Sequence, residues 1–326
     1  MTEQRNVLTI ATGKPLYVNL ALNLARSFYY WNSDTGIKFY LATDRPDLIP
    51  LDVKPFVCII PLTENQLGKG FSTKLHLEKL APPGRTLFID SDCLIYGNIQ
   101  SIFDRFAGHA VSVIGDFISK GEWFGDIESI CKKLRLKKIP KFNGGVYYLE
   151  NGDLAKQIYE TAQNLERRYD EIGFVKLRGT SNDEVLMAVA MEMNGQNPIL
   201  DDGTIMGDLQ ACQGDYKLNV IEGHAELSNP AYPSPLHQSW YPHTTIHPLI
   251  VHFLGYYTQH HPYLLDAYRL RKKLENNLTI WNRLKGNFTI KYPSQLKSAV
   301  KNIFRPLFHC LFGYRSIGRS ERDNIL

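Results

Sequence analysis

The strongest constraint on the fold is an alternation of short apolar runs with segments of helical periodicity over residues 1–115. Residues 7–12 form an apolar run that leads into a glycine, and residues 15–30 follow with a Leu or Phe at every fourth position from 16 to 28. Further apolar runs lie at 37–42, 56–60, 86–89 and 110–114, with helix-like segments at 71–80 and 99–106. This alternation predicts an α/β protein with a parallel sheet covered by helices on both faces.

The second half of the sequence is less regular. Residues 142–149 and 249–253 are strand-like, and residues 154–169, 182–193 and 262–274 have helical periodicity. Between them, residues 195–247 are rich in Pro, Gly and His and follow neither period. At 326 residues the chain is long enough for one large domain or two modest ones.

The composition excludes some classes of protein. A formal net charge of +4 is too small to indicate a nucleic-acid partner. The five cysteines are scattered and form no C-x-x-C motif, as expected of reduced thiols in a cytoplasmic protein. The N-terminus carries no apolar segment of the secretory type, and the chain has no apolar run long enough to predict a transmembrane helix.

The tail, residues 276–326, differs from the rest of the chain. From residue 285 to residue 320 there are seven Lys or Arg and no Asp or Glu. Apolar side chains recur near helical spacing, interrupted by a proline, at Leu296, Val300, Ile303, Leu307, Phe308 and Leu311. One interpretation is a basic amphipathic segment at the inner face of a membrane. The plainer interpretation is a C-terminal helix packed on the domain with its basic face in solvent.

Two aspartates, Asp90 and Asp92, follow the apolar run at 86–89. In an extended chain residues i and i+2 point to the same side, so both carboxylates would reach one point near the strand end. Ligands of open α/β sheets bind at this edge, and oxygen ligands suit hard cations such as Mg²⁺ and Mn²⁺. The alternative is a simple turn, because Asp and Ser favour turns.

Four blocks of the sequence, taken in order, resemble the donor-binding core of a known enzyme family. The blocks are FSTKLH at 71–76, LFIDSD at 87–92, FNGGVY at 142–147 and VHFLG at 251–255. They resemble the retaining glycosyltransferases of family eight, which include glycogenin and bacterial lipopolysaccharide galactosyl- and glucosyltransferases. The resemblance implies one GT-A domain over 1–275, with a nucleotide-binding half at 1–115 and an acceptor half at 116–275. It also implies transfer of a hexose from a UDP-sugar to a glycan, lipid-linked or small hydroxylated acceptor.

The resemblance implies a role for several residues. Asp90 and Asp92 would coordinate Mn²⁺ or Mg²⁺ with His252 as a third ligand, and an imidazole ligand favours manganese. The positions implied to bind the nucleotide-sugar are Thr12, Tyr17, Lys74, Asn143, Gly145 and Gly255. Plainer explanations stay open for some of them: Tyr17 as helix packing, Lys74 as a solvated lysine, and residues 143–145 as a turn.

The sequence departs from the family pattern at two places. Asp183 stands where the family has a glutamine near the reacting sugar carbon, so an ionisable carboxylate there could stabilise an oxocarbenium-like centre or attack it. We therefore name Asp183 and Lys74 as catalytic candidates. Its neighbour Glu184 has capping-box spacing from Ser181 and could serve only the helix start. The family's late lysine, which grips the diphosphate, is absent from 256–262, which leaves His260 or His261 as weaker substitutes.

Two other functions remain open on the sequence alone. A sugar-1-phosphate nucleotidyltransferase shares paired aspartates on an α/β sheet, but it needs a Gly-rich basic loop after the first strand, where this chain has only Gly13 and Lys14. A non-catalytic module of the same fold could bind a sugar nucleotide or a membrane. A basic cluster at 132–141 could meet an anionic acceptor, a membrane or solvent alone; its members are Lys132, Lys133, Arg135, Lys137, Lys138 and Lys141.

Overall fold

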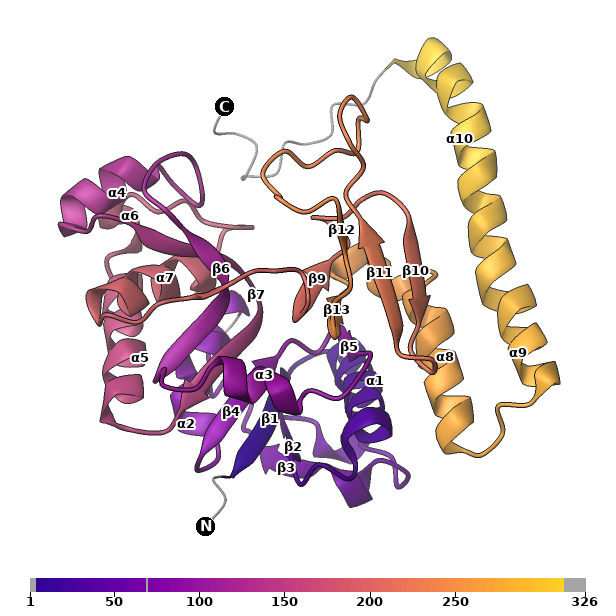
Figure 1. Ribbon diagram of the computed structural model, residues 1–326, viewed down its shortest axis with the longest axis horizontal. Helices are drawn as coiled ribbons and strands as arrows, with labels where there is room; N and C mark the ends of the chain where they lie inside the picture. The colour runs from indigo at the N-terminus through magenta and orange to yellow at the C-terminus, as the bar shows by residue number, and fades with distance from the viewer. Residues whose placement is uncertain (1–3, 69, 314–326) are drawn as a thin grey trace.

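A seven-stranded sheet forms the centre of the protein (Figure 1). The structure is a computed structural model that describes residues 4–68 and 70–313. The sheet has the order β3-β2-β1-β4-β7-β6-β8. Its strands are β1 (Arg5–Ala11), β2 (Lys38–Thr43), β3 (Cys58–Pro61), β4 (Arg85–Ile89), β6 (Val111–Ile118), β7 (Ile139–Glu150) and β8 (Ile199–Leu200).

Most neighbouring strands of this sheet are parallel, as the sequence predicts. Strand β1 pairs in parallel with β2 and β4, β2 with β3, and β6 with β8. Strand β7 is the exception, because it runs antiparallel to both β4 and β6. Its register places Val146 opposite Ile89, so the segment at 143–145 lies beside the residues that follow β4.

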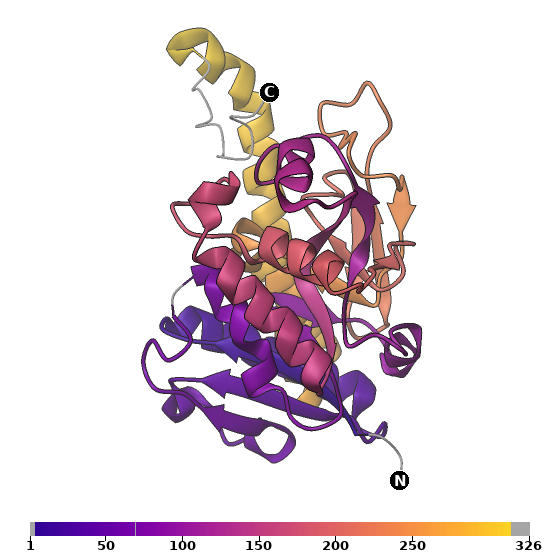
Figure 2. The same ribbon diagram turned by 90° about the vertical axis from the view of Figure 1, so that its left-hand side faces the viewer.

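Helices cover both faces of the sheet, which confirms the predicted class of fold (Figures 1 and 2). The covering helices are α1 (Pro15–Asn32), α3 (Gln100–Arg105), α5 (Asp153–Glu166) and α7 (Asp183–Met193). Helices α5 and α7 share one apolar core with Phe88 and Tyr147 of the sheet. Helices α1 and α3 share the other with Leu87 and Ile89. Consecutive residues of β4 thus enter opposite cores, as the two-residue period of a strand requires.

Two short segments differ from the prediction. Residues 71–80 are not one helix: a 3-10 helix, η3 (Gly70–His76), precedes a single α-helical turn, α2 (Leu77–Leu80). The third strand begins two residues later than expected, because a 3-10 turn occupies Lys54–Phe56. Gly70 has φ +70°, a left-handed conformation that an α-helix does not contain.

A second, smaller sheet brings three distant segments together. Strand β13 (Ile250–His252) lies between β5 (Cys93–Ile95) and β9 (Met206–Asp208). It pairs antiparallel with β5 and parallel with β9, so His252 lies opposite both Cys93 and Asp208. A third sheet in the Pro-, Gly- and His-rich region has the order β10 (Tyr216–Asn219), β11 (His224–Ser228), β12 (Thr245–Ile246).

The C-terminal region is helical, as expected of the tail. Helix α8 (Tyr263–Leu274) is followed by α9 (Ile280–Gly286), a π-helical turn η5 (Asn287–Lys291) and α10 (Tyr292–Phe312). Helix α10 continues through Pro306, so the interruption expected there is wrong. It stands apart at one side of Figure 1 and extends beyond the other elements in Figure 2. The remainder of the tail, 314–326, lies outside the described residues.

A buried polar contact anchors α8 behind the second sheet. The carboxylate of Asp266 accepts hydrogen bonds from the Tyr96 hydroxyl at 2.8 Å and from the Val220 amide at 3.2 Å. Arg269 also lies 3.4 Å from this carboxylate. Burial raises the pKa of Asp266 to about 6 despite these three partners. The folded protein therefore holds a proton on Asp266 at pH values where the unfolded chain has released it.

This proton predicts an unusual pH dependence. A raised carboxyl pKa adds stability at low pH that is lost as the pH rises through about 6, because only the folded state retains the proton. Relative to Asp266→Asn, whose amide oxygen can still accept hydrogen bonds, the wild type should lose up to about 3 kcal/mol of unfolding free energy between about pH 4 and pH 6. Urea unfolding at several pH values measures the difference, with Asp34→Asn at an exposed site as the control. If the difference in unfolding free energy between wild type and Asp266→Asn were the same at about pH 4 and pH 6, the raised pKa of Asp266 would be contradicted.

Candidate functional site

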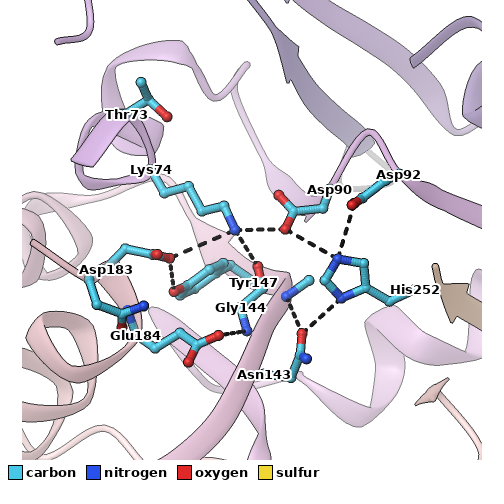
Figure 3. A network of polar contacts seen from close by, with 12 residues as sticks. Thr73, Lys74, Asp90, Asp92, Asn143, Gly144, Tyr147, Asp183, Glu184 and His252 are labelled. Carbon is cyan, nitrogen blue, oxygen red and sulfur yellow. Dashed lines mark hydrogen bonds and ion pairs between the residues drawn. The ribbon is translucent and has the colours of Figure 1, made fainter. Parts of the chain in front are cut away.

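Asp90 and Asp92 lie in a tight turn after β4, where the Cys93 amide donates to the Asp90 carbonyl at 3.0 Å. The extended conformation expected for them is therefore wrong, and the turn considered as an alternative is present. The turn nevertheless brings both carboxylates to one imidazole (Figure 3). Nε2 of His252 lies 3.0 Å from Oδ1 of Asp92 and 3.7 Å from Oδ2 of Asp90. The two aspartates thus face one point, as expected, through a different backbone geometry.

Asn143 fixes the orientation of the His252 ring. The Gly145 amide, which can only donate, lies 2.9 Å from Oδ1 of Asn143. The amide nitrogen of Asn143 then faces a carboxylate oxygen of Asp208 at 3.0 Å. Nδ1 of His252 lies 2.9 Å from the same Oδ1, so this ring nitrogen must carry a hydrogen. The other nitrogen, Nε2, is thereby turned toward Asp90 and Asp92, the arrangement by which outer partners orient metal-binding histidines.

Gly145 is required at this point for steric reasons. A Cβ atom there would lie 2.6 Å from Nδ1 of His252 and 2.9 Å from Sδ of Met206. The carbonyl of Gly145 also accepts from the Asp90 amide at 2.9 Å. The structure thus places Gly145 between the aspartate turn and the histidine ring.

The pKa values of His252, Asp92 and Asp90 depend on burial and on the charges of their neighbours. Burial alone would lower the pKa of His252, but the neighbouring carboxylates of Asp92 and Asp90 raise it to about 9. Burial would raise the pKa of Asp92, yet His252 outweighs this effect and the pKa is lowered. For Asp90, burial prevails over the attraction of Lys74 and His252, and the pKa is raised.

Lys74 joins two parts of the site. Its ammonium lies 2.7 Å from Oδ2 of Asp90, 2.8 Å from the carbonyl of Gly144 and 3.8 Å from Oδ2 of Asp183 (Figure 3). Its side chain is only 14% exposed, so the alternative of a solvated helix lysine is wrong. Burial would favour the neutral amine, but Asp183 and Asp90 outweigh it and the pKa of Lys74 is raised.

Asp183 opens helix α7 and points toward Lys74. The Tyr147 hydroxyl donates to Oδ2 of Asp183 at 2.5 Å, and the residue is 2% exposed. The expected capping box is wrong: the cap is Asn182, whose side chain accepts from the amides of Glu184 and Val185. Asn182 satisfies the first free amides of the helix, so Glu184 is available for another contact. Glu184 accepts from the Gly144 amide at 2.9 Å and thereby ties α7 to β7.

The other predicted donor-binding residues are not part of this network of contacts. Thr12 directly follows β1, and the next amide, that of Gly13, donates to the carboxylate of Asp44 after β2 at 3.0 Å. Tyr17 is 42% exposed on the first turn of α1, so the alternative of helix packing is wrong. Gly255 is exposed and begins a 3-10 helix, η4 (Gly255–Gln259), after His252.

His261 does not supply the positive charge that the missing lysine would have carried. Burial lowers its pKa to about 4, with Lys291 and Arg269 adding to the effect. The ring is therefore neutral at pH 7, and Nδ1 lies 3.3 Å from the Tyr216 hydroxyl. His260 bonds through Nδ1 to the Tyr256 carbonyl at 2.9 Å and stacks on the Tyr256 ring.

Sequence reasoning missed two residues that hold the site together. Tyr147 fixes Asp183, and Asp208 fixes Asn143 while it also accepts from the Gln210 and Ala211 amides. Tyr147 belongs to the recognised FNGGVY block, so a signal for it existed. Asp208 lies in the region without periodicity, and no pattern in the sequence marks it.

The donor set fits a hard divalent cation. Ligands at right angles around an ion bound at about 2.1 Å lie roughly 3 Å apart, which is compatible with the separations of His252 from Asp92 and Asp90. Asp92, Cys93 and His252 also converge on one point. A soft cysteine sulfur suits Mg²⁺ and Mn²⁺ less well than the carboxylate oxygens do. We therefore regard Asp90, Asp92 and His252 as the residues suited to hold the ion.

Comparison with known proteins identifies the fold. No protein-family model and no curated protein matches the sequence. The structure is similar to a galactosyltransferase, LgtC, solved with donor and acceptor sugar analogues: the TM-score is 0.55 at 12% sequence identity, over 84% of this chain and 97% of that chain. It is also similar to an active-site mutant of LgtC, with a TM-score of 0.54 at 13% identity, over 85% of this chain and 99% of that chain. Together with the sheet topology, these likenesses show that the protein has the GT-A fold.

The carboxylates around His252 lead to a prediction for the pKa of its imidazole. In the metal-free wild type it should titrate near pH 9, because Asp92 and Asp90 stabilise the imidazolium. The contribution of this charge to stability is complete below about pH 6.5 and is lost as the pH rises through about 9. In Asp92→Asn the pKa of His252 should fall, since burial then meets less opposition. NMR titration of the imidazole measures both values, and Asp153→Asn on the exposed start of α5 is the control. Titration of the wild type near pH 6.5 would contradict this electrostatic account.

Proposed function

We propose that this protein is a metal-dependent glycosyltransferase. It transfers a hexose from a UDP-sugar to a hydroxyl group of a glycan, a lipid-linked acceptor or a small molecule, with retention of anomeric configuration. The cation is Mn²⁺ or Mg²⁺, and the imidazole ligand favours Mn²⁺. The GT-A fold supports this proposal, and the sequence blocks that led to it meet at one edge of the sheet.

The observation that carries the proposal is the position of His252. This residue lies 160 positions after Asp92, yet its Nε2 is turned toward the two aspartates by a hydrogen bond on its other nitrogen. The outer hydrogen bond leaves Nε2 as the nitrogen that could bind an ion, as in metal-binding histidines. A cation held there would replace the proton that Asp92 and Asp90 favour on the ring of the metal-free protein.

The proposed ion and the residues around its site would have different roles in the reaction. A divalent cation bound here would act as a Lewis acid and neutralise charge that develops on the leaving diphosphate. Lys74 keeps its positive charge through its carboxylate neighbours, so it can attract the diphosphate or a polar group of the sugar. Lys74 shares Asp90 with the proposed metal site, so its ammonium would be able to turn from this carboxylate to the donor if Asp90 held a cation.

Asp183 supplies negative charge on the other side of Lys74. The carboxylate is held by Tyr147 and lies at the amino end of α7, where the helix dipole favours an anion. In this position it can stabilise positive charge at the sugar carbon. We do not propose that it attacks this carbon, because its Oδ2 atom already accepts a hydrogen bond from Tyr147 and lies near Lys74.

The nucleotidyltransferase alternative gains no support. Only residues 12–14 separate β1 from α1, which leaves no room for the Gly-rich loop such an enzyme needs. The non-catalytic alternative is distinguished by turnover. If UDP with Mn²⁺ stabilises the protein against heat but no UDP-sugar yields free UDP, with or without acceptors, the fold serves binding alone.

Removal of one metal ligand tests the proposed function. Asp90→Ala should reduce UDP release from a UDP-sugar by at least about 100-fold, since even outer partners of a metal ligand contribute about 10- to 100-fold. Wild-type activity should fall to background in EDTA and return with Mn²⁺. An enzyme-coupled UDP assay measures both effects, with Asp34→Ala as the control at an exposed site. Normal turnover by Asp90→Ala in EDTA would exclude the metal role.

The adjacent carboxylates Asp183 and Glu184 on α7 allow a matched test of the role proposed for Asp183 at the sugar carbon. Asp183→Asn should lower kcat by roughly 100- to 1,000-fold, the scale for one preorganised electrostatic group. Glu184→Gln retains an acceptor for the Gly144 amide and should lower kcat far less. Mn²⁺ affinity should change little in either variant, because neither residue is a proposed ligand. Equal losses in the two variants would show that Asp183 has no special role.

A further inference from the structure

The largest concentration of exposed apolar side chains lies on the C-terminal arm, which we define as residues 280–312 (α9, η5 and α10). Trp281 is 80% exposed, Ile303 is 72% exposed and Leu296 is 67% exposed. Isolated exposed apolar residues are ordinary, but a contiguous set of this size marks an interaction surface. The expectation that this tail packs onto the domain is wrong for α10, whose apolar side chains remain exposed.

Six of the exposed apolar side chains of α10 form one stripe. Their spacing of three or four residues places them on the same side of the helix: Tyr292, Leu296, Val300, Ile303, Leu307 and Leu311. Three cations, Lys297, Lys301 and Arg305, follow at four-residue steps, each one position after an exposed apolar residue. They therefore lie along one edge of the apolar stripe, on the same side of the helix as the exposed rings of Phe304, Phe308 and Phe312. Long basic side chains in such a row can place their charges in water while their stems lie beside apolar groups.

The charge of the arm determines what can cover it. Residues 276–320 contain no Asp or Glu. A second copy of α10 packed against the stripe would bring rows of like charges together without acidic partners, which is unfavourable. An anionic lipid surface instead provides an apolar interior beside a layer of negative charge, and this matches both rows.

Among residues 4–68 and 70–313, no helix has the length and apolar character needed to cross a bilayer. We propose that the C-terminal arm lies in the interfacial plane of an anionic phospholipid membrane. The apolar stripe enters the boundary between headgroups and acyl chains, and Lys297, Lys301 and Arg305 contact lipid phosphates. This binding is independent of the proposed catalytic function and brings the whole protein to the membrane surface.

Vesicle flotation with the full-length protein tests the proposal. We expect the protein to float with vesicles of phosphatidylcholine containing phosphatidylglycerol and to remain in solution with phosphatidylcholine alone, since each basic residue near an anionic surface contributes several-fold in affinity. Lys297→Gln/Lys301→Gln should weaken binding to the anionic vesicles by roughly 10- to 30-fold. Leu296→Ser/Ile303→Ser should weaken it by at least about 10-fold and leave the salt dependence unchanged.

A matched variant distinguishes vesicle binding by the C-terminal arm from binding by exposed positive charge elsewhere on the protein. Lys132→Gln/Lys137→Gln removes the same charge from exposed positions of the basic cluster at 132–141 and should bind vesicles like the wild type. All three double variants should keep the wild-type thermal unfolding midpoint, because the substituted side chains are exposed.

Three results would overturn the proposal. The first is failure of the wild type to float with anionic vesicles. The second is an equal loss of binding in the variant of residues 132 and 137, which would assign the effect to the basic cluster. The third is a lipid-free dimer in light scattering that Leu296→Ser/Ile303→Ser converts to a monomer, which would make a second copy the occupant of the stripe.

Discussion

Three carboxylates at one edge of the sheet would repel one another if no cation lay between them. Lys74 separates Asp183 from Asp90, and His252 lies between Asp90 and Asp92. The cations remain charged because the carboxylates are close, and burial makes each interaction stronger than it would be in water. The geometry of the site therefore depends on this alternation of charge, and a divalent ion would enter a cluster already arranged for positive charge.

Backbone topology holds the alternating charges in place. Antiparallel strand β7 runs beside the end of β4, and the small sheet brings β13 to the same point. Gly144 and Gly145 permit close contact with α7 and with the His252 ring. The site is thus built on rigid strands and a helix start, whereas the C-terminal arm projects from the body with its apolar side chains exposed.

Elements that depend on local residue order were predicted well, whereas several contacts between residues far apart in the sequence were not. Strands and helices with clear periodicity, such as 15–30 and 86–89, were predicted within a few residues. Details of local conformation were predicted less well. The capping residue of α7 is Asn182 and not Ser181, and Asp90 lies in a turn and not in an extended segment. Asp208 could not be predicted, because its role arises only from its pairing with Asn143 across 65 positions.

The sequence by itself determined the α/β class, the end of β4 at two carboxylates and the amphipathic, acid-free tail, because periodicity and local charge follow directly from residue order. The tertiary structure decided which side chains meet. His252 faces Asp92 and Lys74 faces Asp183 only because β13 and α7 return to the edge where β4 ends. It also decided that the apolar stripe of α10 stays exposed, since packing depends on where the rest of the chain lies in space.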